Sequence, residues 1–190
     1  MKIAIDLDRT IFDTDQLIYN IANHYKYKDI TNAPTDYKEF FAEGVDKGFD
    51  PLFFLKLGDP DSYWEIKGAV DVLKKWKNEG HTIYIISRRP NIKSQQRSAF
   101  YWLQKHGVKY DHLILSCKNK PYYCREKGID LIIDDMIQNC NGCDQLGITS
   151  IWLKNKQNAP LETFKRENVI TSSSWKEIDS IVDQLEESCL

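Results

Sequence analysis

Two aspartates close the first apolar segment of the chain, and they constrain its fold more than any other feature. Residues 2–8, KIAIDLD, run as a buried strand would through Ile3, Ala4 and Ile5, and then place Asp6 and Asp8 around a leucine. An unpaired charge is costly to bury, so this strand needs a reason to end on two carboxylates. Alternate residues of an extended chain share a side, so we expect both carboxylates to point at one centre.

Apolar runs alternate with helical periods along most of the chain, which is typical of a doubly wound parallel sheet. After the first strand, strands are predicted at 81–87, 112–116, 130–135 and 150–153, with a short edge strand at 169–170. Helices are expected to end at Gly80, Gly107, Gly128 and Gly147, and a final helix should follow serines 172–174. The fold class is therefore α/β, a Rossmann-like sheet of five to six strands with helices on both faces.

One stretch breaks this rhythm. About sixty residues separate the first strand from the helix near Ala69, where a doubly wound unit needs far fewer. The stretch is rich in aromatic residues. We expect a small helical cap at residues 15–67, inserted into an α/β core formed by residues 1–14 and 68–190.

Composition excludes several classes of protein. The chain has 190 residues, 42% of them apolar, and a formal net charge of −2. These values favour a folded domain and give no broad basic surface for nucleic acid. No apolar run approaches the length of a membrane span, and the chain enters a strand without a signal-peptide layout. We expect a cytoplasmic protein with a small-molecule partner and no nucleic-acid or membrane partner; its oligomeric state does not follow from the sequence.

The five cysteines agree with a reducing compartment. Their number is odd, and the chain is too large to need a disulfide framework. Cys140 and Cys143 form a C-x-x-C pair, which could be a redox pair or half a zinc site, but Cys117 and Cys124 are spaced too widely to complete it. Reduced, partly buried thiols are the favoured interpretation.

Polar residues stand where ligands bind in open parallel sheets, at the carboxyl ends of the strands. Carboxylates, a hydroxyl and ammonium groups reach this edge from separate parts of the chain: Asp6, Asp8, Ser87, Lys118, Lys120, Asp134 and Asp135. Each is weak evidence alone, but together they are hard to explain as packing.

These residues resemble the motifs of the haloacid dehalogenase superfamily of phosphatases. DLDRT fits its D-x-D-x-T signature, IIS ending at Ser87 its second motif, Lys120 before a helix its third, and LIIDD its fourth. The order and spacing match over nearly the whole chain. WEIKGAVDVLKKWKNEGHTIYIISRRP and GIDLIIDD resemble the 5′(3′)-deoxyribonucleotidase branch most closely.

The residues themselves suit phosphoryl transfer from a monoester. Asp6 is ionised at neutral pH and can form a labile acyl phosphate, so it is the expected nucleophile. Asp8 would protonate the leaving alcohol and then deprotonate the attacking water. Clustered carboxylates without His or Cys ligands favour Mg²⁺ beside a phosphate. The resemblance implies metal ligands from the Asp6 side chain, the Asp8 carbonyl and the Asp134–Asp135 pair, one directly and one through water.

The resemblance also assigns phosphate contacts to Ser87 and to Lys120, which is preferred over Lys118 because it stands where the helix begins. Thr10 would hold the turn after the strand. Arg9 departs from the glycine that relatives often carry, and it could touch substrate phosphate or point into solvent. Arg88 and Arg89 could steer an anionic substrate or belong to a solvated loop.

The expected function is that of a Mg²⁺-dependent phosphomonoesterase that forms an aspartyl-phosphate, acting as a 5′-nucleotidase on (deoxy)nucleoside monophosphates. Aromatic residues of the cap could stack a base or form its core: Phe53, Phe54, Tyr63 and Trp64. The alternatives are a phosphatase for another metabolite such as a sugar phosphate, and a phosphate-binding protein of the same fold without turnover. Repair of nucleic-acid 3′ ends is disfavoured by the net charge.

Overall fold

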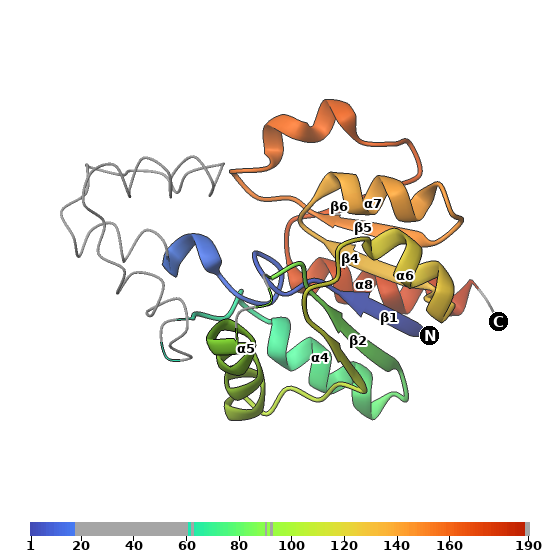
Figure 1. Ribbon diagram of the computed structural model, residues 1–190. Helices are drawn as coiled ribbons and strands as arrows, with labels where there is room; N and C mark the ends of the chain where they lie inside the picture. The colour runs from blue at the N-terminus through green and yellow to red at the C-terminus, as the bar shows by residue number, and fades with distance from the viewer. Residues whose placement is uncertain (18–60, 62, 90, 92, 189–190) are drawn as a thin grey trace, which may run out of the picture.

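The protein is built on a parallel six-stranded sheet, seen in a computed structural model that describes residues 1–17, 61, 63–89, 91 and 93–188 (Figure 1). The strand order is β3-β2-β1-β4-β5-β6, and every neighbouring pair is parallel. The strands are β1 Lys2–Ile5, β2 Thr82–Ile86, β3 His112–Ile114, β4 Leu131–Asp134, β5 Thr149–Leu153 and β6 Ile170–Ser172. The predicted α/β class and strand positions are confirmed.

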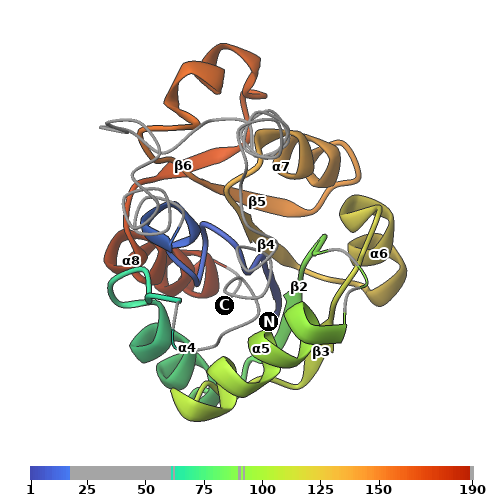
Figure 2. The same cartoon turned by 60° about the vertical axis from the view of Figure 1, so that its left-hand side comes forward.

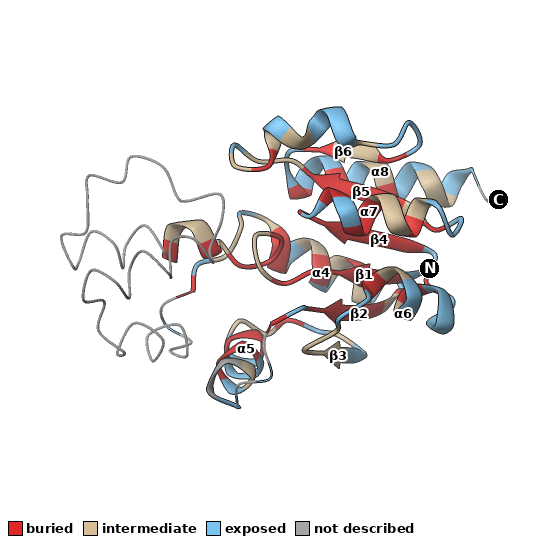
Figure 3. Cartoon of the chain, turned by 45° about the horizontal axis from the view of Figure 1, so that its top comes forward, coloured by how far each residue is buried: buried red, intermediate tan, exposed pale blue. Residues whose placement is uncertain are grey.

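Helices cover both faces of this sheet (Figures 1 and 2). One face carries α4, α5 and α8, and the other carries α6 and α7. Their bounds are α4 Ala69–Asn78, α5 Lys93–Lys105, α6 Lys120–Lys127, α7 Ile137–Asp144 and α8 Trp175–Glu187, with a 3-10 helix η2 at Ala159–Phe164. The inner strands are buried between the layers, the edge strand β3 is partly exposed, and the helices expose their outer sides (Figure 3).

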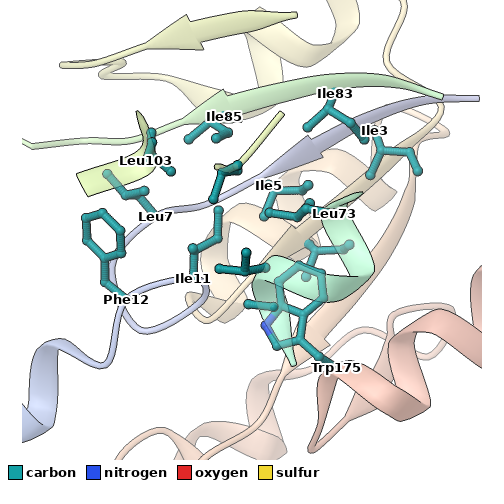
Figure 4. Packing of buried hydrophobic residues seen from close by; sticks show 14 of the residues in the cluster. Ile3, Ile5, Leu7, Ile11, Phe12, Leu73, Ile83, Ile85, Leu103 and Trp175 are labelled. Carbon is teal, nitrogen blue, oxygen red and sulfur yellow. The ribbon is translucent and has the colours of Figure 1, made fainter. Parts of the chain in front are cut away.

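Alternation along β1 builds the two cores. Ile3 and Ile5 face the larger cluster, with Leu73 of α4 and Trp175 of α8 (Figure 4), whereas Ala4 faces the cluster under α6 and α7. Because the inner strands β1, β2, β4 and β5 are covered on both sides, they are nearly continuous apolar runs. This is why a carboxylate at a strand end is conspicuous in the sequence.

The helix boundaries follow the predicted caps. Gly128 ends α6 with a φ of 61°, a left-handed conformation that suits glycine. At the start of α8, the Ser174 side chain accepts a hydrogen bond from the Glu177 backbone N–H at 3.2 Å. These local signals determine where α6 ends and where α8 begins.

The loop after β1 folds back on itself and on the segment that precedes α4. The Leu7 carbonyl accepts hydrogen bonds from the backbone N–H groups of Ile11 and Phe12, at 2.9 and 2.8 Å. Asp13 N–H donates to the Trp64 carbonyl at 2.8 Å, and Ile66 N–H donates to the Ile11 carbonyl at 2.9 Å. Residues 11–13 and 64–66 therefore run side by side. Most of the expected cap, residues 18–60, lies outside the described residues.

Three cysteines are buried free thiols. Cys124 on α6 and Cys143 on α7 share the smaller core cluster, and Cys140 lies against the end of β4. Burial raises the pKa of the Cys140 thiol well above its usual value. Gly142, between the two cysteines of the C-x-x-C pair, lets α7 approach Pro121, since a β-carbon there would stand 2.7 Å from the proline Cγ. Gly142, inside the C-x-x-C pair, thus allows close packing of α7 against α6.

No helix in the described ranges combines the length and the apolar character needed to cross a membrane.

Trp175 ties α8 to the loop after β1, which yields a stability prediction. Its indole N–H donates to the Thr10 carbonyl at 2.8 Å, and the ring is fully buried. Trp175→Phe should cost about 1–3 kcal/mol in unfolding free energy beyond the lost ring volume, because a buried carbonyl is left unpaired. Urea denaturation of this variant and of Trp76→Phe provides the comparison.

Trp76 is a matched control because it is equally buried, but its indole N–H donates to Asp179, whose side chain is partly exposed and also paired with Lys75. Water and Lys75 can serve Asp179 after the change, so Trp76→Phe should cost less. Equal losses in the two variants would contradict the importance of the Thr10 contact.

Candidate active site

Three buried aspartates meet at the carboxyl ends of β1 and β4. The register pairs Ile5 with Ile133, and the Asp6 N–H donates to the Ile133 carbonyl at 2.9 Å, so Asp6 lies beside the end of β4. Asp6 and Asp135 are each 6% exposed, and Asp134 is fully buried. One carboxylate oxygen from each lies within 4.8 Å of the others.

Lys120 stands between two of these carboxylates. It is the first residue of α6, whose N-terminus is capped by the Asn119 side chain accepting from Tyr122 N–H at 3.1 Å. Its ammonium donates to Asp134 Oδ2 at 2.7 Å and to Asp6 Oδ1. Lys120 is 2% exposed, whereas Lys118 is exposed. The structure therefore brings Lys120 into the constellation and leaves Lys118 outside it.

The cluster carries more negative charge than Lys120 balances. Burial raises the pKa of Asp6 to about 7; Lys120 opposes this effect, while Asp134 and Asp8 add to it. Burial, followed by repulsion from Asp6 and Asp134, also raises the pKa of Asp135 well above its usual value. The Asp135 carboxylate accepts no hydrogen bond from any described residue. An all-carboxylate group with surplus charge is the donor set that a hard divalent cation such as Mg²⁺ prefers.

Asp8 has a different partner. Its carboxylate accepts from Arg89 Nε and Nη2, both at 2.7 Å, and from the Thr14 hydroxyl at 2.9 Å. Burial alone would raise the pKa of Asp8, but Arg89 and Thr14 outweigh it and hold the pKa below its usual value. Asp6 and Asp8, the two catalytic candidates that follow β1, thus have pKa values shifted in opposite directions.

The sequence did not distinguish Arg89 from Arg88. It left open whether the two arginines steer an anionic substrate or belong to a solvated loop. Arg89 is only 7% exposed, so the interpretation as a solvated loop is wrong for it; Arg88 is exposed. The Arg89 guanidinium lies over the rings of Phe12 and Tyr63, 5.0 and 4.7 Å from their centroids. Two adjacent arginines after a strand give no periodicity that would tell which one turns inward.

The remaining candidates around β1 are also placed. Ser87 is buried, donates its N–H to the Ile114 carbonyl at 2.9 Å, and accepts from Arg89 N–H through its hydroxyl at 3.1 Å. The Thr10 hydroxyl lies 3.5 Å from Asp6 Oδ2. Arg9 has a φ of 60° and donates to Asp15 Oδ1 at 2.7 Å with its side chain 13% exposed, which excludes a solvated side chain.

The aromatic candidates divide into two groups. Tyr63 is 6% exposed and packs against Phe12 and Arg89, next to Asp8. Trp64 is 59% exposed and borders a hollow of about 390 Å³, whose other lining residues include Lys105 and His106 and none of the aspartates Asp6, Asp8, Asp134 and Asp135. Phe53 and Phe54 lie outside the described residues. Of the two aromatic candidates that the structure describes, Tyr63 is the one that lies beside a catalytic candidate.

The Lys120 bridge yields a second prediction. Lys120→Met should destabilise the fold by about 3–5 kcal/mol, because it leaves two buried carboxylates without their shared cation. Lys118→Met removes the same charge from an exposed position and should change the unfolding free energy by less than about 0.5 kcal/mol. Chemical denaturation of both variants distinguishes the two lysines, and similar losses would contradict the bridge.

Comparison with known proteins agrees with this constellation. The family model described as "5' nucleotidase, deoxy (Pyrimidine), cytosolic type C protein" matches residues 1–186. No protein of curated function matches the sequence significantly.

Similar solved structures share the fold at low identity. A HAD-superfamily hydrolase from Ehrlichia chaffeensis is 18% identical with a TM-score of 0.58, covering 97% of this chain and 96% of its own. A predicted phosphoglycolate phosphatase from Haemophilus somnus 129pt is 16% identical with a TM-score of 0.65, covering 95% and 97%. The D,D-heptose 1.7-bisphosphate phosphatase from B. bronchiseptica is 11% identical with a TM-score of 0.59, covering 97% and 99%.

The family model spans nearly the whole chain, and the motifs that it covers converge at one sheet edge. The predicted resemblance to the haloacid dehalogenase superfamily is thereby confirmed. The chain belongs to the cytosolic type C 5′ nucleotidase family of that superfamily, and it is a phosphoric monoester hydrolase.

Proposed function

We propose that this chain is a Mg²⁺-dependent 5′-nucleotidase that hydrolyses nucleoside monophosphates, deoxynucleotides among them, through an aspartyl-phosphate. The observation that carries the proposal is the contrast between Asp6, in a buried acidic cluster beside Lys120, and Asp8, two residues away with a separate set of partners. Asp6 can attack a phosphoryl group held at the acidic cluster, while Asp8, two residues further along an extended chain, is placed to exchange a proton with the ester oxygen.

In the first step Asp6 is the nucleophile. A carboxylate oxygen of Asp6 forms a bond to phosphorus while the bond from phosphorus to the ester oxygen breaks, and Asp8 gives its proton to that oxygen. Lys120 lies against Asp6 and balances part of the negative charge of the phosphoryl group. Ser87, buried at the end of β2, supplies a hydroxyl for a phosphoryl oxygen.

In the second step water replaces Asp6. The water oxygen bonds to phosphorus, its proton passes to Asp8, and the bond from phosphorus to Asp6 breaks, which returns Asp6 as a carboxylate and releases inorganic phosphate. The same side chain thus acts first as acid and then as base, and it ends each cycle in its starting state.

Asp6, the Asp8 carbonyl and the Asp134–Asp135 pair would hold the Mg²⁺. Their fit rests on three oxygen donors within 4.8 Å and on the surplus buried charge. When bound, the metal supplies positive charge that offsets the charge of the phosphoryl group. The heptose bisphosphate phosphatase of the same fold was solved with magnesium and phosphate, which supports this assignment.

The family description supports a nucleotide substrate. Sugar phosphates and other small phosphomonoesters are the second candidate, because phosphatases named for such substrates share the fold. A binding protein without turnover is disfavoured, since nucleophile, acid–base candidate, lysine and acidic pair are all present at one edge.

A substrate panel tests the proposal. Phosphate release is measured for nucleoside and deoxynucleoside 5′-monophosphates and for sugar phosphates, with Mg²⁺ and with a chelator. We expect Mg²⁺-dependent turnover with the nucleotides ahead by at least about tenfold in kcat/KM, the effect of about 1.4 kcal/mol of extra transition-state binding. A preference for sugar phosphates would overturn the nucleotidase assignment but keep the phosphatase.

Asp6→Asn tests the covalent step. Turnover should fall by at least about 10³-fold because the amide is a poor nucleophile. Acid-quenched enzyme mixed with a ³²P-labelled substrate should retain label at Asp6 in the unaltered protein and lose it in the variant. Full hydrolysis by Asp6→Asn would contradict an aspartyl-phosphate route.

Metal binding should also appear as stability. Mg²⁺ at about 100 times its dissociation constant should stabilise the fold by about 2.7 kcal/mol. Asp135→Asn should raise the melting temperature of the metal-free protein, since one buried carboxylate is removed, and should abolish most of the Mg²⁺-dependent increase. Asp71→Asn, at an exposed position on α4, should leave both values unchanged. A persistent Mg²⁺ effect in Asp135→Asn would remove Asp135 from the metal site.

A further inference from the structure

Arg89 forms two hydrogen bonds to Asp8, the candidate acid, although the proposed mechanism gives Arg89 no role. Its planar guanidinium donates from Nε to Asp8 Oδ2 and from Nη2 to Asp8 Oδ1, both at 2.7 Å. This two-pronged geometry fixes the rotation of a carboxylate as well as its position. A lysine or a single hydrogen bond would leave the rotation free.

The guanidinium is itself held on both sides. The Phe12 and Tyr63 rings lie 5.0 and 4.7 Å from it, and their own centroids are 4.9 Å apart. The Arg89 backbone N–H donates to the Ser87 hydroxyl at 3.1 Å. Arg89 thus connects Ser87, the candidate phosphate ligand at the end of β2, to Asp8, the candidate acid after β1.

The Asp8 carboxylate has more lone-pair sites than Arg89 and Thr14 occupy. A carboxylate offers about four lone-pair sites, two on each oxygen. Arg89 Nη2 and the Thr14 hydroxyl occupy Oδ1, while Arg89 Nε occupies one site on Oδ2. Contacts among the described residues leave one site, on Oδ2. The Asp8 side chain is 30% exposed, while that of Arg89 is only 6% exposed.

We infer that Arg89 is a positioning residue of the reaction: with Thr14 it fixes the Asp8 carboxylate so that the lone pair on Oδ2 that the described residues leave unoccupied exchanges the proton with the leaving group and with water. This inference rests on the proposed function, in which Asp8 is the acid and base. It assigns Arg89 a role through Asp8 rather than a contact with the phosphate.

The choice of leaving group tests this role. An alkyl monoester such as a deoxynucleotide needs a proton at the departing oxygen, whereas p-nitrophenolate leaves readily as an anion. Arg89→Gln should lower kcat for the nucleotide by about 100-fold, the scale of one acid–base contribution, with KM changed less than about threefold. In rapid-quench experiments with p-nitrophenyl phosphate, the first-turnover burst of p-nitrophenolate should stay within about threefold of the unaltered enzyme.

A double-variant comparison separates positioning from a general loss of structure. Asp8→Asn should show the same dependence on leaving group, and adding Arg89→Gln to it should cause little further loss, because residues that act as a unit are not additive. Thr14→Val, which removes one hydrogen bond from Oδ1 and leaves the ring contacts intact, should give a smaller loss of the same pattern. Arg125→Gln, on the exposed side of α6, is the control for removal of a cation.

Distinct results overturn distinct claims. An equal loss with both substrates, a raised KM with unchanged kcat, or a further large loss in the Asp8→Asn background would show that Arg89 binds the phosphate, and would reject the positioning role. Normal nucleotide turnover by Arg89→Gln alongside a strong Asp8→Asn defect would reject it as well. Normal turnover of both substrates by Asp8→Asn would instead reject the proposed acid–base function.

Discussion

The ion contact between the Lys120 ammonium and the carboxylates of Asp6 and Asp134 is the interaction on which this site depends. Parallel pairing of β1 with β4 forces both carboxylates to the same edge, where they would repel one another in a buried setting. A cation delivered from a third element makes the arrangement tolerable. The start of α6 is therefore a structural requirement of the sheet and, in the proposed mechanism, also a part of the chemistry.

Residues near Lys120 in the sequence determine the position of its ammonium group. The Asn119 cap sets the first residue of α6, and Gly128 sets its end. Gly142 lets α7 lie close against Pro121, which holds the first turn of α6 in place. Two small residues and a cap thus determine the position of a side chain that reaches the centre of the site, and its stem is fully enclosed. The remaining negative charge, on Asp6 and Asp135, costs stability in the metal-free protein. In the proposed function a bound Mg²⁺ would offset this cost, because a ligand that binds only the folded state stabilises it.

Most of the sheet and most of the acidic centre could be predicted, because both follow from the hydrophobic periodicity and from the residues that end strands and helices. Continuous apolar runs mark buried strands, glycines mark helix ends, and strands that end on Asp6 and Asp134 must present them at one edge. Arg89 could not be assigned in this way. It lies between a strand and a helix, its neighbour Arg88 has the same chemistry, and its partners Asp8, Phe12 and Tyr63 come from other parts of the chain. The insertion after β1 shows no strong period that would order its aromatic residues.

The position of Arg89 explains how such an insertion can coexist with a fixed catalytic loop. Phe12 lies just before the expected cap at residues 15–67 and Tyr63 lies near its end, and the Arg89 guanidinium lies over both rings. Backbone hydrogen bonds from Asp13 to Trp64 and from Ile66 to Ile11 join the same two passages of chain. The base of the insertion is thus closed by contacts that also orient Asp8. A segment whose two ends are already fixed to the core can vary in sequence without moving the residues at its base, and Asp8, the proposed acid, is held at that base.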